Sequence, residues 1–303
     1  MTEQKRIMYS EISANKRKTF LLIGVFFILI LGLGYLFDYL FQSGGAWVFV
    51  AVIISVVMSL TGYFSGDKVA LWQAGAKGPI KQEDNPYVYK MVENLAITSG
   101  LPMPKVYLIP DAAPNAFATG RDPKHASVAI TAGIIERLEN EELEGVIAHE
   151  MSHIKNYDIR VMMLVGVLAG VVIMMADFFL RGRLFHGRDS ENRNAGGVLL
   201  IVGLVFAILS PIFAQLIQLA VSRKREFLAD ASGALLTRYP EGLARALEKI
   251  ASYTKPMQKA SDATAHLYIS NPFGAKAMKG FAKLFSTHPP MEERVKALRG
   301  MTV

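Results

Sequence analysis

The stretch His149-Glu150-Met151-Ser152-His153 lies in a segment that is predicted to be helical from about Asn140 to Ile154. Asn140 is a favourable residue at the start of a helix, and the helix dipole favours the carboxylates that follow it. Those carboxylates in the first turn are Glu141, Glu142 and Glu144. Residues four apart share a helix face, so His149 and His153 can present two imidazoles to one metal ion, with Glu150 beside them. The alternative interpretation is two histidines with ordinary structural roles.

A metal site of this kind needs a third ligand, because catalytic sites generally combine three protein ligands with a water. A candidate lies in residues 222–230, Ser-Arg-Lys-Arg-Glu-Phe-Leu-Ala-Asp, which begin a helix that is predicted to reach about Thr237. Glu226 can bind the metal, and Asp230, one turn further along the same face, can accept the outward N–H of a ligand histidine. A Glu and an Asp four residues apart are also common on solvated helix faces. Glu226 and Asp230 therefore indicate a metal site only in combination with the two histidines.

Four apolar blocks surround these motifs, at residues 19–41, 46–64, 161–180 and 197–220. Apolar residues make up 51% of the chain and charged residues only 19%, a balance that is unusual for a soluble domain. As a helix, the first block would extend about 34 Å, enough to cross a hydrocarbon core of roughly 30 Å. Its length and the block that follows it favour a retained membrane span over a cleaved signal peptide.

The net charge of +7 indicates the orientation of these spans. Basic residues precede the first block and follow the second, so the N-terminus is expected in the cytoplasm. They are Lys5, Arg6, Lys16, Arg17 and Lys18 before it, and Lys68, Lys77 and Lys81 after it. The sequence has no basic helix with interleaved aromatic residues, which argues against nucleic-acid binding. It contains no cysteine, which excludes disulfides and thiolate ligands.

Between the second and third blocks the sequence has the mixed composition of a globular domain. It predicts a helix at about 86–98 and three short strands, at 105–109, 117–119 and 127–131, which would form a small sheet. Towards the C-terminus it predicts helices at 241–253 and 292–299, separated by a loop at 254–283. The expected fold class is mainly α, with polytopic membrane helices and an α+β domain that contains a small sheet.

Taken together, these motifs resemble the HtpX family of bacterial membrane zinc proteases, relatives of the CAAX prenyl proteases. The resemblance rests on residues 114–120, 131–133, 149–153, 223–230 and on Thr287-His288-Pro289-Pro290. Two apolar segments before the metal helix and a hairpin after it are also arranged as in that family. The resemblance implies a zincin-like domain with one Zn²⁺ per chain, held by His149, His153 and Glu226. It implies Glu150 as the catalytic base and Asp230 as the partner of a ligand histidine.

Two further parts of the site follow from the resemblance alone. Residues Asn115, Ala116, Phe117 and Ala118 would form an edge strand that holds an extended substrate through main-chain hydrogen bonds. His288 and Arg294 would approach the reaction centre and hydrogen-bond the developing oxyanion. The alternative is that His288 caps the final helix and that Arg294 pairs with Glu292 or Glu293.

The resemblance implies five parts of the chain. These are a basic cytoplasmic N-terminus (1–18), a transmembrane hairpin (19–64), the first part of the catalytic domain (65–160), a second hydrophobic hairpin (161–220) and the second part of the catalytic domain (221–303). Because both sides of the second hairpin supply ligands, it crosses the membrane twice or not at all. If it crosses, the arginines between its two blocks lie outside, against the positive-inside preference. They are Arg181, Arg183, Arg188 and Arg193.

The expected function is that of a zinc endopeptidase in the bacterial inner membrane, with its active site facing the cytoplasm. The resemblance implies membrane-protein quality control under stress, in contact with lipids, by cleavage of misfolded membrane proteins at cytoplasmic segments. It also implies functional overlap with an ATP-dependent membrane protease, and the sequence has no Walker-type motif of its own. One alternative is a membrane scaffold or transporter with a non-proteolytic metal site, and another is a different metalloenzyme that uses the same histidine motif without cleaving peptides.

Several other polar residues are assigned ordinary roles. His125, His186 and His266 have no metal-ligand spacing to another candidate, so we expect structural roles for them. Asp38 and Asp177 lie within apolar blocks, where a carboxylate is costly. Each is close to the end of its block, so solvation at the membrane interface is the expected explanation.

Overall fold

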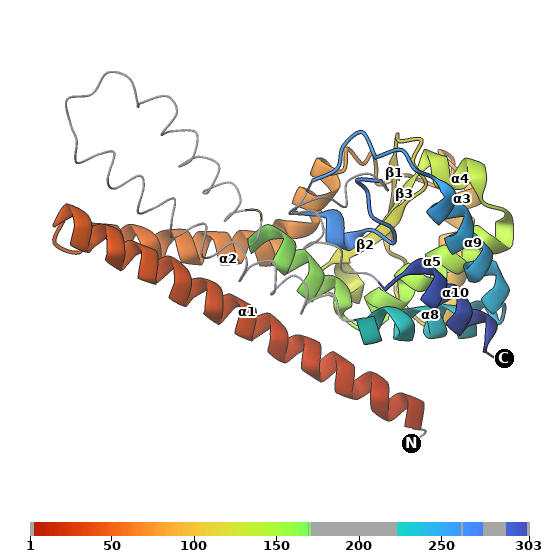
Figure 1. The fold of residues 1–303 in the computed structure, drawn as a ribbon, viewed down its shortest axis with the longest axis horizontal. Coiled ribbons are helices and arrows are strands. Elements are labelled where there is room, and N and C mark those ends of the chain that lie inside the picture. Colours follow the sequence, from red (N-terminus) through yellow and green to blue (C-terminus); the bar gives the residue numbers. More distant parts are fainter. Residues whose placement is uncertain (1–2, 169, 171–222, 262, 275–288, 302–303) are drawn as a thin grey trace.

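Figure 1 shows the fold as a computed structural model. The structure describes residues 3–168, 170, 223–261, 263–274 and 289–301. The expectations for Asp177, His186, His288 and most of the second hydrophobic hairpin lie outside the described residues. Of that hairpin, residues 161–168 and 170 are described, and they are helical.

Two long helices, α1 (Glu3–Phe41) and α2 (Ala46–Gln73), form an antiparallel hairpin that extends away from the rest of the chain (Figure 1). Both are long and apolar enough to cross a membrane, over Ser13–Tyr39 and Ala46–Gln73. Many of their apolar side chains face outward: Phe20 and Ile28 are each 74% exposed. Apolar surface of this extent is normally covered, and two such helices are typical of a membrane-spanning hairpin. Each helix is longer than its apolar block, and α2 continues past Phe64.

The turn between α1 and α2 explains the carboxylate at the end of the first block. Gly45 has a positive φ of 98°, and its N–H donates to the two carboxylate oxygens of Asp38 at 2.8 and 2.9 Å. The hydroxyl of Ser43 donates to the same carboxylate. Asp38 therefore closes the hairpin, a specific role beyond the interfacial solvation that we expected for it.

The globular part contains a three-stranded sheet of β1 (Lys105–Ile109), β2 (Ala116–Gly120) and β3 (Ala126–Thr131). The order is β1-β3-β2, with β1 parallel and β2 antiparallel to β3. The three predicted strands are thus confirmed, and β2 lies at an edge of the sheet. A 3₁₀ turn, η1 (Pro123–His125), joins β2 to β3.

The remaining elements are helical. They are α3 (Pro86–Ser99), α4 (Ala132–Arg137), α5 (Asn140–Lys155), α8 (Arg223–Thr237), α9 (Pro240–Ser252), the 3₁₀ turn η2 (Ala265–Leu267) and α10 (Met291–Arg299). Helix α5 lies at the centre, in contact with α3, α8, α9 and β2. Its core residues, such as Leu143 and Ile147, are fully buried. The predicted helices are confirmed, and the described part of the predicted loop at 254–283 is irregular apart from η2.

The start of α5 differs in one detail from the prediction. Its N-cap residue is Glu139, and Asn140 is already the first helical residue. The carboxylate of Glu142 accepts the N–H of Glu139 at 2.9 Å, which satisfies a donor that the helix leaves unpaired. The same carboxylate, almost completely buried, also binds Lys249 of α9 at 2.7 Å. Glu142 therefore fixes both the start of the helix and its packing.

Candidate active site

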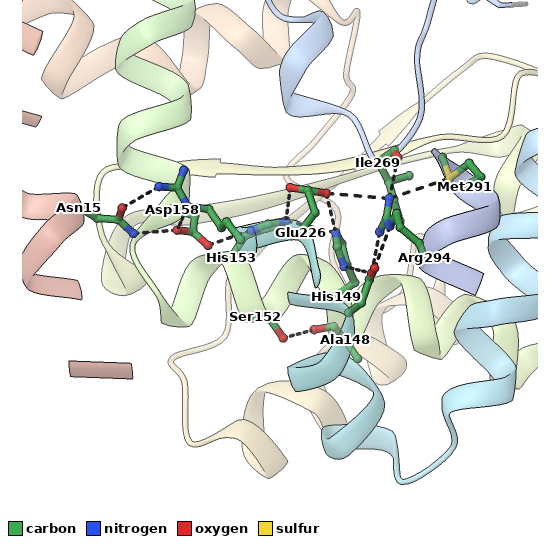
Figure 2. Close-up of polar contacts among 12 residues, drawn as sticks. Asn15, Ala148, His149, Ser152, His153, Asp158, Glu226, Ile269, Met291 and Arg294 are labelled. Atoms are coloured by element: carbon green, nitrogen blue, oxygen red, sulfur yellow. Dashed lines mark hydrogen bonds and ion pairs between the residues drawn. The ribbon is translucent and has the colours of Figure 1, made fainter. Parts of the chain in front are cut away.

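Three buried side chains meet where helices α5 and α8 pack together (Figure 2). The Nε2 atoms of His149 and His153, both on α5, are 3.1 Å apart. The carboxylate of Glu226 on α8 lies 3.8 Å from Nε2 of His149 and 3.6 Å from Nε2 of His153. Ligands bonded to one tetrahedral zinc at about 2.0–2.1 Å lie about 3.3 Å apart, so these three can hold one metal ion.

Close packing of α8 on α5 brings the third side chain to the two histidines. At Gly233 of α8 an added Cβ would lie 2.9 Å from the backbone nitrogen of His149. Any larger residue at Gly233 would therefore push the two helices apart. Since Glu226 lies two turns before Gly233 on α8, this contact sets the distance between the carboxylate and the imidazoles.

The ring of His149 is held from behind by a carboxylate. Its Nδ1 lies 2.9 Å from Oδ1 of Asp230, the residue that the sequence predicted for this position. With the proton on Nδ1, the lone pair of Nε2 faces the metal position. Burial alone would raise the pKa of Asp230, but Arg294 and the contact with His149 lower it to about 2.

Arg294 of α10 completes this arrangement and is fully buried. Its Nε and Nη2 donate to the two oxygens of Asp230 at 2.8 and 2.6 Å, and Nη1 lies 3.9 Å from Oε2 of Glu226 (Figure 2). The alternative pairing with Glu292 or Glu293 is therefore wrong. Burial lowers the pKa of Arg294, but the charge of Asp230 outweighs it and the net shift is upward.

The ring of His153 is held by a second carboxylate, which the sequence analysis missed. Its Nδ1 lies 3.0 Å from Oδ2 of Asp158, just beyond the end of α5. Oδ1 of Asp158 forms an ion pair with Nε of Arg225 on α8 at 2.7 Å and accepts a hydrogen bond from Nδ2 of Asn15 on α1 at 2.7 Å. Burial would lower the pKa of His153, but Asp158 and the charge of Glu226 raise it to about 9 in the metal-free protein. The signal was an acidic residue five positions after His153.

Glu150 points towards the sheet. Its side chain is 2% exposed. Burial raises the pKa of Glu150, and the neighbouring His149 and His153 offset part of that rise. The backbone N–H of Ala118 on β2 also lies close enough to the carboxylate to offset part of the rise in pKa. Glu150 is the one carboxylate between the two histidines in the sequence. It therefore lies near both the metal position and the edge strand β2.

One end of the β2 edge is already paired within the chain. The N–H of Ile269 donates to the carbonyl of Ala116 at 3.0 Å, and the side chain of Asn115 bonds the backbone carbonyl of Ser270 at 2.9 Å. The ring of Phe117 packs edge-on against Tyr268 at 4.9 Å between centroids. A peptide that pairs with β2 therefore has to displace Ile269 or lie beyond it.

Two other histidines have local partners. His125 is half exposed and its Nδ1 lies 2.8 Å from Asp122. His266 is buried, and its Nε2 lies 2.8 Å from the carbonyl of Met162. Both contacts agree with the structural roles that we expected. His288 lies outside the described residues.

The outward-facing apolar hairpin and the buried triad beside a sheet edge define a membrane-bound metalloprotease. Residues 82–302 match peptidase family M48. The chain is 45% identical to a "Protease HtpX homolog" of Thermoanaerobacter pseudethanolicus over 303 residues, 99% of either chain. It is 48% identical to one of Tropheryma whipplei over 296 residues, 97% of this chain and 99% of that one. The chain belongs to peptidase family M48, and the resemblance found in the sequence is confirmed.

A solved structure supports the fold. The crystal structure of Ste24p from S. mikatae matches with a TM-score of 0.50 and 18% sequence identity. The match covers 96% of this chain and 67% of that chain. The fold is mainly helical with a small sheet, in agreement with the predicted fold class.

Proposed function

We propose that this chain is a zinc endopeptidase whose metal ligands are His149, His153 and Glu226 and whose general base is Glu150. The observation that carries the proposal is the convergence of three buried ligand atoms within 4.8 Å of one another. Two imidazoles and a carboxylate are a common ligand set for catalytic zinc in peptidases. When bound, Zn²⁺ would supply Lewis acidity to a water molecule and to the scissile carbonyl.

Each side chain then has a distinct task. Glu150 takes a proton from the attacking water and passes it to the leaving nitrogen, a task that its raised pKa favours. Asp230 and Asp158 hold the two imidazoles with their Nε2 atoms turned inward. Arg294 orients Asp230, and with His288 it would contribute positive charge near the oxyanion.

The substrate strand in this proposal lies along Asn115, Ala116, Phe117 and Ala118. An edge strand recognises a peptide through its backbone, so it tolerates many sequences. The contact of α5 with β2, and the influence of the Ala118 backbone on the pKa of Glu150, support this placement, because a peptide along β2 would pass beside the proposed base. Pairing at Ala116 requires that Ile269 moves away.

The proposed location is the bacterial inner membrane, with five parts as the sequence predicted and the active site on the cytoplasmic side. The basic residues of α1 that precede its apolar block support that orientation, and Asn15, near the start of the candidate span Ser13–Tyr39, contacts the side chains around the metal position. Membrane lipids would surround α1 and α2. Substrates would be misfolded membrane proteins, whose loose cytoplasmic segments need no unfolding motor here. Substrates that must first be unfolded would be left to an ATP-dependent membrane protease, with which this protein would overlap in function.

The test is casein digestion by the detergent-purified protein, together with its zinc content. Glu150→Gln removes the base and no ligand, so we expect zinc to stay bound and cleavage to fall by at least about 10²-fold. Glu226→Ala removes a ligand, so we expect both zinc and activity to be lost. Glu144→Gln, the same change on the same helix but away from the site, is the control and should cleave normally.

A Glu150→Gln protein that digests casein at the control rate would refute Glu150 as the base. A Glu226→Ala protein that keeps one zinc per chain would remove Glu226 from the ligand set. Digestion that a zinc chelator does not slow would overturn the proposal as a whole.

A further inference from the structure

A buried asparagine on the first membrane helix lies among the side chains that support the metal site. Asn15 of α1 is 1% exposed. Its Nδ2 donates to Oδ1 of Asp158 at 2.7 Å and to the carbonyl of Asn156 at 3.0 Å. Its Oδ1 accepts from Nη2 of Arg225 at 2.9 Å. Figure 2 shows Asn15 beside Asp158, which in turn lies against His153. Asn15 is far from these partners in the sequence.

The amide matches its surroundings in one orientation only. Its nitrogen faces a carboxylate and a carbonyl, which accept, and its oxygen faces a guanidinium, which donates. A carboxylate at position 15 would face the oxygen of Asp158, and an alkyl group would leave buried polar atoms without these hydrogen bonds. The side chain of Asn15 thus satisfies both members of the buried Asp158 and Arg225 ion pair.

The turn that carries Asp158 is also fixed from α1. Helix α5 ends at Lys155, and Tyr157 adopts a positive φ of 61°, which turns the chain so that Asp158 lies behind His153. A non-glycine residue with positive φ is held in place by its surroundings. Here Asn15 bonds the carbonyl of Asn156, and Lys16 lies over the ring of Tyr157 at 5.2 Å.

The two elements that Asn15 connects both carry metal ligands. Asp158 follows α5, with its ligand His153, and Arg225 precedes the ligand Glu226 on α8. A displacement of α1 therefore acts on both sides of the metal position. Outer partners of metal ligands typically contribute 10–100-fold to metal affinity or activity.

We propose that Asn15 is a positioning residue of the metal site, through which the first membrane helix sets the orientation of Asp158 and hence of His153. This inference rests on the proposed function, because it takes His153 as a metal ligand. It goes beyond that function in making α1 a part of the metal site as well as a membrane anchor. Asn15 itself does not touch the metal or the substrate.

The test uses full-length protein in detergent and measures Co²⁺ affinity, the visible absorption of bound Co²⁺, and the kcat and KM for a casein-derived peptide. We expect Asn15→Asp to lower Co²⁺ affinity about tenfold and to change the absorption bands. The kcat should fall while KM stays the same, because the β2 edge is untouched. Thr19→Val is the matched control: Thr19 is buried one turn further on, and its hydroxyl bonds the carbonyl of Asn15 within α1 at 2.9 Å.

A double variant separates positioning from a general loss of folding. Asn15→Asp combined with Asp158→Asn exchanges amide and carboxylate, so that one negative charge again faces Arg225. We expect the double variant to recover part of the affinity and of the Co²⁺ spectrum that each single variant loses. Losses that simply add in the double variant, or a wild-type spectrum in Asn15→Asp, would overturn the inference. Wild-type protein that binds no metal would instead refute the proposed function.

Discussion

The two imidazoles of the proposed metal site are each supported by a group of buried side chains, called here the first and the second arm, which have similar composition but come from different parts of the fold. In the first arm, His149 is bound by Asp230, and Arg294 binds Asp230 through two parallel hydrogen bonds. In the second arm, His153 is bound by Asp158, which Arg225 and Asn15 hold. Each arm is a histidine, an aspartate and an arginine, all buried. Among the described residues of the two arms, only the second arm has an amide side chain, that of Asn15, which contacts the aspartate together with the arginine.

The difference between the arms concerns which part of the chain supports them. Arg294 belongs to α10, near the C-terminus, whereas Asn15 belongs to the membrane helix α1. All residues of the first arm thus belong to the globular part. The second arm includes a residue of the α1–α2 hairpin, so its geometry depends on the position of that hairpin. The proposed metal site is therefore connected to the apolar hairpin through one of its two histidines.

The largest effect that distinguishes the arms is expected from removing each arginine. Arg294→Met leaves Asp230 buried without its two hydrogen bonds, which should cost about 3–5 kcal/mol of stability and release the metal. Arg225→Met should cost less, because the amide of Asn15 still donates to Asp158. Thermal unfolding of the metal-free proteins in detergent, with metal content of the loaded ones, measures both.

A third arginine provides the control. Arg299 lies on α10, five residues after Arg294, and binds Glu241 and Glu248 with distances near 2.9 Å. Its side chain is 45% exposed, and exposed ion pairs contribute little to stability, so Arg299→Met should behave like the wild type. Equal losses in the Arg225 and Arg294 variants would show that Asn15 does not compensate.

A smaller effect is expected when each aspartate is made neutral. Asp230→Asn and Asp158→Asn keep the shape of the side chain and weaken its hold on the imidazole N–H. Each should lower zinc affinity by about 10–100-fold, measured by competition with a chromophoric chelator. Both arms should lose a similar amount, because the distances from Nδ1 to the carboxylate are 2.9 and 3.0 Å.

Asp122→Asn is the matched control for the aspartate variants. Asp122 also bonds a histidine Nδ1, that of His125 at 2.8 Å, but this pair is exposed and remote from the metal ligands. Zinc affinity should not change in this variant. If Asp158→Asn likewise bound zinc as the wild type does, the second arm would have no part in holding the metal.

The arms also differ in how far the sequence could predict them. Asp230 follows Glu226 by four residues on one helix, so helical periodicity alone placed it on the ligand face. Asp158 comes after the end of α5, where no periodicity applies, and its direction depends on the positive φ of Tyr157. Asn15 could not be assigned at all, because its partners are more than a hundred residues away.

The elements of the fold were predictable for a related reason. Strands β1, β2 and β3 and helices α3, α5, α8, α9 and α10 follow from local patterns of apolar residues, glycine and proline, and they appear near their expected bounds. The partner of Arg294 was not predictable, because it depends on how α10 packs against α8. The full length of α2 was missed because polar residues such as Asp67 and Lys68 lie beyond its apolar block.

The smallest difference between the arms is expected in the pH dependence of the metal-free protein. In the second arm the folded state holds the pKa of His153 at about 9, above the usual value of 6.5. A raised pKa means that the folded state binds the proton more tightly than the unfolded state. This stabilisation is complete below about pH 6.5 and is lost as the pH rises through about 9. In the first arm the pKa of Asp230 is lowered to about 2, so its contribution is complete above about pH 4 and is lost only as the pH falls towards 2.

The two arms therefore respond to opposite ends of the pH scale. Between pH 7 and 9.5 the melting temperature of the metal-free protein should fall by a few degrees, since a domain of this size shifts about 2–4 °C per kcal/mol. Asp158→Asn should flatten this alkaline slope, because it removes the partner that raises the pKa of His153. Asp230→Asn should leave the slope in place, and it is the control. A slope that persists in Asp158→Asn would mean that Glu226, and not Asp158, holds the proton on His153 in the absence of metal.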